Sequence, residues 1–371
     1  MRKILMSLCF LCACLMAAAG CSSPANAPSS APSDSVPAAD EVIAWKIQGF
    51  NSAGTTNDSY ARNLMARITE LSGGRLQIDY YPADAIFPTS EMGNALRDGI
   101  VDGINFYAGQ FTGIDEAFSL FNSTPGLFAR PTDQALWFRY GGGMELWQEM
   151  ADSYDMNMHI LLSGVVDGEN FLWSNRPIHE IEDMQRLTVR FMPIFGSVLA
   201  DHGISVVALP GTEVVPGLER GVIDAGEYST PDFDRSMGFQ DVAKYVIRPG
   251  IHQPGGNNSI AIRQDRWDNL PDDLKAVVEA ACAEAVLNNF GDQRMKNIEA
   301  MQFFEEAGIE VCLLSDDAVN TMNQWAQEWL EQKCETNPWM KRVVDSQKAF
   351  VKNYAAYSDS MDLPWPQWML N

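Results

Sequence analysis

The stretch Pro88-Thr-Ser-Glu91, with Gly99-Ile-Val-Asp102-Gly103 shortly after it, decides the fold because the chain repeats it. The second copy is Pro210-Gly-Thr-Glu213, with Gly221-Val-Ile-Asp224-Ala225 at the same spacing. Each copy predicts a capped helix, a glycine stop and a strand that starts two residues later. Helix-glycine-strand turns also recur in unrelated α/β proteins, but the matched spacing favours two lobes of similar make.

Polar or aromatic residues follow the predicted strand in both copies. The first strand runs into Asn105-Phe106-Tyr107 and the second into Glu227-Tyr228. In an open α/β sheet, ligands bind at the carboxyl ends of strands. Two lobes that present such ends to each other form a cleft, so we expect the ligand site between the lobes.

Strand-like and helix-like patterns alternate through the rest of the folded region, which predicts an α/β protein with parallel strands. The expected elements of the first lobe are strands at 42–50, 76–80, 100–107 and 158–162 and helices at 60–71, 91–97 and 132–154. A second block of strands and helices runs from about 171 to 246, and long helices are expected at 272–289, 293–307 and 318–331. The predicted division is lobe 1 at 41–166, completed by about 254–310, lobe 2 at 167–253, and C-terminal helices at 311–371.

The first twenty residues have the pattern of a secretory signal. Arg2 and Lys3 precede an apolar run at 4–19, and small residues stand directly before Cys21. This order predicts a lipoprotein signal at 1–20 that leaves Cys21 as a lipidated first residue. An ordinary signal peptide with a chance cysteine is the alternative. Residues 21–40 are rich in Ser, Pro and Ala, which predicts a flexible tether. We therefore expect an exported protein that is lipid-anchored at the cell envelope.

Composition and missing motifs exclude several functions. The formal net charge of −23 repels nucleic acid and anionic lipid. No nucleotide-binding loop, H-E-x-x-H or G-x-S-x-G motif is present, so neither an organic cofactor nor a recognisable catalytic motif is expected. No two of the four histidines have ligand spacing: His159, His179, His202 and His252. Beyond Cys21, the cysteines Cys282, Cys312 and Cys334 allow at most one disulfide.

Several segments resemble one protein family. Leu187-Thr-Val-Arg190, followed by Pro193, and the stretch from Pro210 to Tyr228 look like the receptors of tripartite ATP-independent periplasmic (TRAP) transporters of the DctP type. The similarity continues through Tyr81-Pro-Ala83, Gly238-Phe239, Ala243-Lys-Tyr245, Pro249-Gly-Ile-His-Gln253 and Trp267-Asp-Asn-Leu-Pro271. It spans roughly residues 45 to 335 and lies nearest the branch that binds 2-oxo and 2-hydroxy acids, often with a cation.

The resemblance implies both a fold and a function. The implied fold has two lobes, a periplasmic-binding-protein-like ligand cleft between them and long C-terminal helices. The implied function is that of a receptor, not an enzyme, which delivers a small organic acid anion to a membrane permease. A lipid-anchored extracellular hydrolase or lyase that uses carboxylates such as Glu227 and Asp224 is the alternative.

Arg190 is the first candidate for a contact with the acid. The resemblance places the family's substrate arginine here, in the apolar setting of Val189, Phe191 and Met192. A guanidinium offers two parallel donors to a carboxylate, which fixes its orientation as well as neutralising its charge. A salt bridge to an acidic neighbour is the alternative role.

The resemblance also implies a cation site. Glu227 matches the acidic ligand, Asn170 lies near the amide ligand and Gln253 matches a further oxygen ligand. Such an all-oxygen set suits Na⁺ or Ca²⁺. Glu169 is an alternative to Asn170, and Glu227 has the alternative role of a partner of Arg190 without any ion.

Four aromatic residues complete the candidate site. Tyr107 follows a strand of the first lobe and is a candidate donor to the acid, and Tyr228 stands where the family usually has Trp. Phe87 and Trp173 are candidate walls of the site, with core packing as the alternative for each. The C-terminal tryptophans point to a homodimer through the C-terminal helix or to contacts with the chain's own lobes: Trp325, Trp329, Trp339, Trp365 and Trp368.

Overall fold

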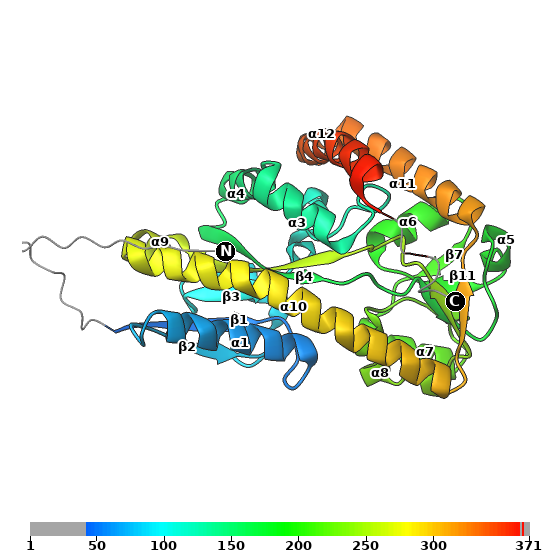
Figure 1. The fold of residues 1–371 in the computed structure, drawn as a ribbon, viewed down its shortest axis with the longest axis horizontal. Helices are drawn as coiled ribbons and strands as arrows, with labels where there is room; N and C mark the ends of the chain where they lie inside the picture. Colours follow the sequence, from blue (N-terminus) through cyan, green and yellow to red (C-terminus); the bar gives the residue numbers. More distant parts are fainter. Residues whose placement is uncertain (1–41, 364–365, 367–371) are drawn as a thin grey trace, which may run out of the picture. The chain divides into compact units, whose positions relative to one another are not determined.

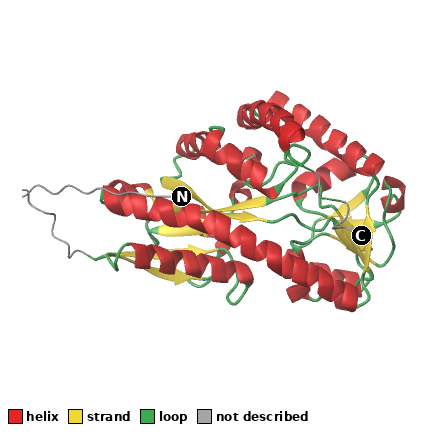
Figure 2. Cartoon of the chain, viewed as in Figure 1, coloured by secondary structure: helices red, strands yellow, loops and turns green. Residues whose placement is uncertain are grey.

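The computed structural model describes residues 42–363 and 366, and its strands form two separate sheets. The expected signal, tether and lipidated Cys21 lie outside the described residues, as do Trp365 and Trp368. Figure 2 shows the strands in two groups, each bordered by helices. The predicted two-lobe α/β fold is confirmed by this arrangement, and we call the parts around the first and second sheets lobe 1 and lobe 2.

The first sheet has the strand order β2-β1-β3-β10-β4. Its strands are β1 (Ile43–Gly49), β2 (Leu76–Tyr81), β3 (Gly103–Phe106), β4 (Met158–Val166) and β10 (Gly256–Arg263). β1 is parallel to β2 and β3, whereas β10 is antiparallel to both β3 and β4. The predicted strands β1, β2 and β3 are parallel as expected, but the sheet as a whole is mixed because β10 was not predicted within it. A strand from much later in the chain separates β3 from β4, and no local pattern announces such a long-range pairing.

The second sheet has the order β11-β9-β5-β8-β6-β7. Its strands are β5 (Leu172–Ser174), β6 (Thr188–Arg190), β7 (Ser205–Val207), β8 (Ala225–Gly226), β9 (Tyr245–Arg248) and β11 (Glu310–Leu313). β6 is parallel to β7 and β8, and β5 is antiparallel to β8 and β9. The chain passes between the sheets three times, from β4 to β5, from β9 to β10 and from β10 to β11.

The repeated sequence forms the same structure in both lobes. The 3₁₀ turn η1 (Thr89–Glu91) leads into α2 (Met92–Arg97), and η4 (Gly211–Glu213) leads into α7 (Val214–Glu219). Gly99 and Gly221 follow these helices with φ of 75° and 68°, a left-handed conformation that favours glycine.

The strand after each glycine starts later than predicted. β3 begins at Gly103 and β8 at Ala225, because an aspartate first clamps the neighbouring strand. Asp102 donates its N–H to the Lys46 carbonyl (2.8 Å) and accepts the Lys46 N–H on its carboxylate (2.9 Å). Asp224 makes the same two contacts with Thr188, both at 2.8 Å. In each lobe, these two contacts of the aspartate take the place of the first backbone hydrogen bonds between the new strand and its neighbour.

Helix α10 (Asp272–Glu306) is a single helix of 35 residues. It contacts β4 of the first sheet and α8 of lobe 2, and Figure 1 shows it in yellow alongside both. The prediction of two helices at 272–289 and 293–307 is wrong. Gly291 lies in the gap between them, and a glycine within a helix costs only about 1 kcal/mol relative to alanine.

The C-terminal helices pack on their own chain. α11 (Asp316–Thr336) and α12 (Pro338–Met361) contact each other. α11 also contacts α6, while α12 contacts α4 and the 3₁₀ turn η3. On α12 the side chains of Met340, Val343 and Val344 are buried. Figure 1 shows α11 and α12 in orange and red beside α3 and α4.

The remaining helices cover the sheets or connect strands. They are α1 (Thr56–Leu71), α3 (Pro131–Tyr140), α4 (Gly143–Ser153), α5 (Ile181–Met184), α6 (Pro193–Asp201), α8 (Pro231–Met237), α9 (Gln264–Asp268), η2 (Ala108–Phe111), η3 (Glu116–Phe121) and η5 (Phe239–Asp241). The helix predicted at 132–154 is two helices, α3 and α4, separated where Gly142 has a φ of 80°. Within 42–363, no helix is long and apolar enough to cross a bilayer. Cys282, Cys312 and Cys334 are free thiols.

Candidate functional site

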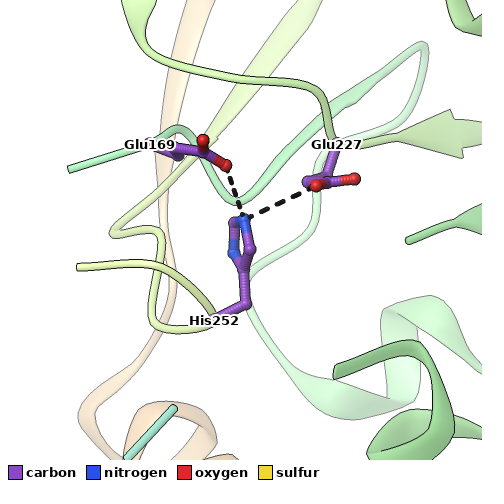
Figure 3. A group of neighbouring side chains, drawn as sticks. All are labelled: Glu169, Glu227 and His252. Atoms are coloured by element: carbon purple, nitrogen blue, oxygen red, sulfur yellow. Dashed lines mark hydrogen bonds and ion pairs between the residues drawn. The ribbon is translucent and has the colours of Figure 1, made fainter. Parts of the chain in front are cut away.

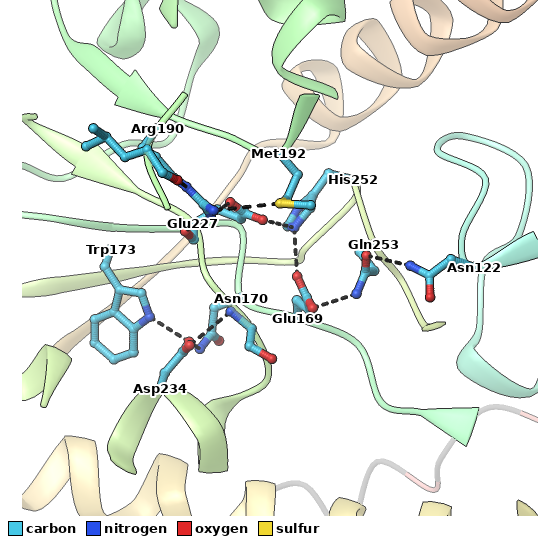
Figure 4. A network of polar contacts seen from close by, with 12 residues as sticks. Asn122, Glu169, Asn170, Trp173, Arg190, Met192, Glu227, Asp234, His252 and Gln253 are labelled. Atoms are coloured by element: carbon cyan, nitrogen blue, oxygen red, sulfur yellow. Dashed lines mark hydrogen bonds and ion pairs between the residues drawn. The ribbon is translucent and has the colours of Figure 1, made fainter. Parts of the chain in front are cut away.

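Arg190 and Glu227 meet because they end neighbouring strands. Arg190 is the last residue of β6, Glu227 directly follows β8, and the two strands are paired in parallel with Arg190 opposite Gly226. The Arg190 Nη1 forms an ion pair with the Glu227 carboxylate and also donates to the Glu227 carbonyl (2.7 Å). Both side chains are almost fully buried, with 5 % and 1 % exposed. Figure 4 shows the pair at one end of a larger polar network.

One nitrogen of Arg190 has almost nothing to bind. Its Nε donates to the Leu209 carbonyl at 3.1 Å, whereas Nη2 reaches only the sulfur of Met192 at 3.6 Å. Thioether sulfur is a weak acceptor. Met192 is itself 43 % exposed, so this side of the guanidinium is covered only by a partly exposed side chain. Arg190 therefore keeps a donor for an anion while Glu227 occupies the other side.

His252 lies between two buried carboxylates (Figure 3). Its Nε2 is 3.2 Å from the Glu169 carboxylate and 4.0 Å from the Glu227 carboxylate. One possible ligand atom from each of the three residues lies within 4.8 Å of the others. The three come from the β4–β5 passage, the end of β8 and the β9–β10 passage, so the site assembles where the chain crosses between lobes.

Burial shifts the ionisation of all three groups toward the neutral form. Burial raises the pKa of Glu169 to about 8, although Arg190 opposes the shift. Burial likewise raises the pKa of Glu227 to about 7, opposed by the charges of Arg190 and His252. Burial lowers the pKa of His252 to about 4, against the pull of Glu227. One arginine thus faces two carboxyl groups that lack a second cation among the described residues.

The side chain of Asn170 is hydrogen-bonded to a buried aspartate, Asp234. Its Nδ2 donates to Asp234 at 2.8 Å, and Trp173 Nε1 donates to the same carboxylate oxygen at 2.7 Å. The Ser229 N–H donates to the other oxygen of Asp234 at 3.0 Å. Burial raises the pKa of Asp234, which has no exposed surface, and these hydrogen bonds oppose the shift. Trp173 is buried in the core against Phe239 and Phe304.

Gln253 joins the network through Glu169. Its Nε2 donates to the Glu169 carboxylate at 2.5 Å, and its Oε1 accepts from Asn122 Nδ2 at 3.5 Å. The Glu169 N–H in turn donates to the Gln253 carbonyl at 3.1 Å. The amide oxygen of Gln253 consequently has one long hydrogen bond among the described residues.

The three remaining aromatic candidates pack against other aromatic or apolar residues of their own lobe. Tyr107 ends the strand region of lobe 1 with its ring against Phe50, and its hydroxyl makes no hydrogen bond within residues 42–363. Tyr228 packs its ring beside Phe233 and Phe239 of lobe 2. Phe87 is buried in the core of lobe 1. Their roles at the site stay predictions.

Two members of this network, His252 and Asp234, are not among the site residues that the sequence predicts. His252 was set aside because no histidine pair has ligand spacing, but here the partners of the imidazole come from separate loops. The signals for His252 are the family-like stretch Pro249-Gly-Ile-His-Gln253, in which it lies, and the adjacent predicted site residue Gln253. Asp234 carries no local signal, because nothing in the sequence separates it from the surface aspartates.

Three buried polar atoms in this network have no hydrogen-bond partner among the described residues. They are Glu227 Oε1, Asn170 Oδ1 and His252 Nδ1. A buried polar atom without a partner costs about 1–3 kcal/mol, so three in one place indicate a missing ligand or ion. Asp224 is not among these groups: it is exposed and clamps β6 instead.

Comparison with known proteins agrees with the fold and the family. The model of the family described as bacterial extracellular solute-binding protein, family 7, matches residues 48–337. A monocarboxylate 2-oxoacid-binding periplasmic protein of Nostoc sp. is 24 % identical over 306 residues, which cover 82 % of this chain and 83 % of that protein.

Solved structures show the same fold. A TRAP transporter solute-binding protein of Bordetella bronchiseptica, described with copurified calcium and picolinate, has a TM-score of 0.79 at 23 % identity and covers 87 % of this chain and 96 % of its own. A TRAP periplasmic solute-binding protein of Colwellia psychrerythraea with bound calcium and pyruvate has a TM-score of 0.78 at 22 % identity, with coverage of 87 % and 98 %.

These findings decide between the two functional classes that the sequence left open. The matched family consists of binding proteins, and its model covers well over half of the chain. The prediction of a solute receptor is thereby confirmed, and the alternative hydrolase or lyase finds no support. This chain belongs to the bacterial extracellular solute-binding proteins of family 7.

Proposed function

We propose that the chain is the solute receptor of a TRAP transporter, which binds a small 2-oxo or 2-hydroxy acid together with a cation and delivers the acid to a membrane permease. The observation that carries this proposal is the buried network around Arg190. One arginine with a spare donor lies beside carboxyl groups and beside three polar atoms that lack partners. An acid and a cation satisfy those atoms together.

The donor set fits a hard cation. Glu227 Oε1 and Asn170 Oδ1 are buried oxygens without hydrogen-bond partners within the described part of the chain, and Glu169 and Gln253 add further oxygens. Such oxygen donors suit Ca²⁺ or Na⁺. His252 has its Nε2 among the carboxylates, and an imidazole ligand suits transition metals instead. We propose Asn170, Glu227 and Gln253 as the cation ligands, with Glu169 and His252 next to the ion.

Charge explains why the ion and the acid belong together. Burial raises the pKa of Glu169 to about 8 and that of Glu227 to about 7, so near neutral pH the ion-free site keeps protons on these oxygens. A cation that binds these oxygens displaces the protons and leaves both carboxylates ionised, so that Arg190, Glu169 and Glu227 together carry a net charge of minus one. A divalent cation reverses that sign and draws Glu227 toward itself, which frees the guanidinium of Arg190 for two parallel bonds to a carboxylate.

The relatives support the acid class. The Nostoc protein is named for 2-oxoacid binding, and solved relatives hold pyruvate with sodium or calcium. From lobe 1 we propose Tyr107 as a second donor to the acid, because its hydroxyl is unpaired and follows β3. Tyr228 and Phe87 are proposed as walls of the site.

Calorimetry tests the proposal. The protein is stripped with chelator in sodium-free buffer and titrated with pyruvate, lactate, malonate and a 2-oxo acid with a longer chain. Each titration is repeated with Ca²⁺, Na⁺, Mn²⁺ or Zn²⁺ added back. We expect binding of one acid per chain only when an ion is present. A preference for Mn²⁺ or Zn²⁺ makes His252 a ligand. Equal binding without any ion contradicts the cation role.

Two variants locate the site. Glu227→Gln is expected to weaken ion and acid together, because the two bind as a unit and linkage is reciprocal. Arg190→Lys is expected to weaken mainly the acid, by about 1.5–3 kcal/mol, because an ammonium lacks the paired donors. Arg220→Lys is the matched control, since Arg220 is an exposed partner of Glu213. Unchanged acid affinity in Arg190→Lys removes Arg190 from the site.

We also propose export with a lipid anchor on Cys21. The support is the signal pattern at 1–20, and the family is extracellular. Cys21→Ser is expected to move the protein from the membrane fraction to the soluble fraction of cells that process lipoproteins. If the variant remains in the membrane fraction, the anchor is wrong.

A homodimer through the C-terminal helix is the last part of the proposal. Its support is the exposed aromatic and apolar surface at the end of α12, where Tyr357 is 64 % and Met361 59 % exposed. Sedimentation of the full chain and of Tyr357→Glu is the test. A monomer in the unmodified protein at high concentration rules the dimer out.

A further inference from the structure

We infer that Asp234 is a positioning residue that sets the orientation of the Asn170 amide and thereby points its oxygen at the cation site. The inference rests on the proposed function, since it assigns Asn170 Oδ1 to an ion. It adds a residue that lies outside the proposed ligand set and that no sequence pattern identified. Figure 4 shows Asp234 and Asn170 below Glu169 in the same network.

The surroundings of Asp234 consist of donors. Asn170 Nδ2 and Trp173 Nε1 donate to one carboxylate oxygen at 2.8 and 2.7 Å, and the Ser229 N–H donates to the other at 3.0 Å. Asp234 has no exposed surface and forms no ion pair among residues 42–363. In these three contacts both oxygens of Asp234 act as acceptors, which is the role that a carboxyl oxygen plays toward N–H donors.

This arrangement removes the usual freedom of an amide. The oxygen and nitrogen of an asparagine side chain have nearly the same shape, so the neighbouring groups decide which way the amide faces. A carboxylate at 2.8 Å accepts the NH₂ group and repels the oxygen. Asn170 must then turn Oδ1 away from Asp234, and this oxygen is buried without a partner.

The helix that carries Asp234 is fixed by hydrogen bonds to two other helices. Asp234 lies on α8, whose Asp232 N–H donates to Asn297 Oδ1 of α10 at 3.0 Å. Asp232 also accepts a bond from Thr56 Oγ1 of α1 at 3.0 Å. Because α8 is tied to two other helices, the carboxylate of Asp234 has little freedom to follow Asn170 if that side chain turns. Groups that orient a ligand in this way contribute strongly to ion binding.

A double-mutant cycle on the full chain tests the inference. Ca²⁺ affinity is measured by calorimetry for the unmodified protein, Asp234→Asn, Asn170→Ala and the double variant, all with saturating pyruvate. Asparagine at 234 offers one acceptor where three donors converge, so the amide of Asn170 loses its fixed orientation. We expect Asp234→Asn to weaken Ca²⁺ by about 10–100-fold, the range for groups that orient a metal ligand. In the Asn170→Ala background, the same change is expected to have no further effect.

Each other outcome overturns the inference. An unchanged Ca²⁺ affinity in Asp234→Asn shows that Asn170 does not need the carboxylate. An equal loss with and without Asn170 shows that Asp234 acts on the ion by its charge. Trp173→Phe is the control, because it removes a donor to the same oxygen and leaves the Asn170 bond in place. A loss in this control as large as that in Asp234→Asn assigns the effect to general disturbance of the core.

The test separates this inference from the proposed function. If the unmodified protein binds no ion, and Glu227→Gln therefore changes nothing, the proposed function fails and Asp234 has no ligand to position. If the unmodified protein binds Ca²⁺ and Glu227→Gln abolishes it, the cycle judges Asp234 alone. Urea unfolding of each variant shows whether a folding defect accompanies the change in affinity.

Discussion

The two lobes place different residues at the same point of the same structure. In lobe 2, Arg190 lies opposite Gly226 and donates from Nε to the Leu209 carbonyl at 3.1 Å. In lobe 1, Gln48 lies opposite Ile104 and donates from Nε2 to the Phe87 carbonyl at 2.9 Å. Ile104 and Gly226 hold the same position in the two copies of the repeated sequence, so Gln48 is the counterpart of Arg190.

The counterparts differ in what they leave unsatisfied. Gln48 Oε1 accepts from the Ile86 and Phe87 N–H groups at 2.7 and 3.3 Å, which completes its hydrogen bonds. Asn105, the counterpart of Glu227, donates to the Ser259 carbonyl at 3.1 Å. In lobe 1 the side-chain amides of Gln48 and Asn105 form hydrogen bonds with backbone groups. In lobe 2, among the described residues, Arg190 Nη2 has only a weak acceptor and Glu227 Oε1 has no hydrogen-bond partner. The repeat supplies the scaffold, and two substitutions supply the chemistry.

The largest effect is expected when lobe 2 receives the residue of lobe 1. Arg190→Gln removes the guanidinium and leaves Glu227 buried without its cation. Breaking a buried pair in this way costs about 3–5 kcal/mol of folding free energy. Acid binding is expected to disappear in calorimetry. Adding Glu227→Gln is expected to restore much of the stability in urea unfolding but no binding. Retained binding in the single variant contradicts the role of Arg190.

The opposite test removes the lobe 1 counterpart. Gln48→Leu leaves the Ile86 and Phe87 N–H groups and the Phe87 carbonyl without their partner, which is expected to cost about 1–3 kcal/mol. Acid and ion affinities are expected to stay unchanged, because the two lobes divide structure from chemistry. Urea unfolding and calorimetry on one preparation measure both quantities. A large loss of affinity makes Gln48 part of the site.

The carboxyl groups of lobe 2 are expected to give the stability a pH dependence near neutrality. The folded protein holds protons on Glu169 and Glu227 up to pKa values of about 8 and 7, whereas the unfolded chain releases them near 4.5. Stability therefore falls as pH rises through this window. His252 acts oppositely, because its pKa falls from 6.5 to about 4, but only below pH 6.5. Between pH 6.5 and 8, the ion-free protein is expected to lose on the order of 2 kcal/mol.

Urea unfolding across that range in chelator measures this loss. Glu169→Gln is expected to flatten most of the slope, because its amide does not titrate. Saturating Ca²⁺ is expected to flatten the slope in the unmodified protein as well, since the ion favours the ionised carboxylates. A slope that survives Glu169→Gln and Glu227→Gln together places the titration elsewhere.

The smallest effects are expected at the two aspartate clamps. Asp102→Ala and Asp224→Ala each remove one hydrogen bond to the N–H of a neighbouring strand, worth about 0.5–1.5 kcal/mol. The cost is expected to be larger for Asp102, which also pairs with Arg266 at 2.8 Å. Thermal unfolding of the pair makes the comparison. A greater loss at Asp224 contradicts the equivalence of the clamps.

Sequence patterns predicted the features that depend only on residues close together in the chain. The two glycines at 99 and 221 ended their helices as expected, because only glycine adopts the left-handed conformation at low cost. The same patterns misjudged Gly291, where α10 continues through the glycine. The insertion of β10 between β3 and β4 depends on a pairing between distant segments, which period and composition do not encode.

The residues of the candidate site likewise fall into two groups, those that a local pattern predicts and those that depend on contacts between distant segments. Arg190 and Glu227 follow strands, so a rule about strand ends located them and the structure brings them together. His252 and Asp234 come from a passage and from a short helix, and their partners are remote in sequence. A histidine or an aspartate in such segments looks like a surface residue until the fold places it between other polar groups.

The strong negative charge of the chain has a kinetic consequence. With a formal charge of −23, the surface gathers small cations and repels small anions before either reaches the site. Approach of the acid is therefore slowed in dilute buffer, and added salt speeds it by screening charges beyond a Debye length of about 8 Å at physiological ionic strength. Salt is expected to affect the release of the acid much less, because buried charges are screened much less than exposed ones. Under the proposed function, the ion is therefore expected to bind before the acid, and the rate of acid binding is expected to rise with the salt concentration outside the cell.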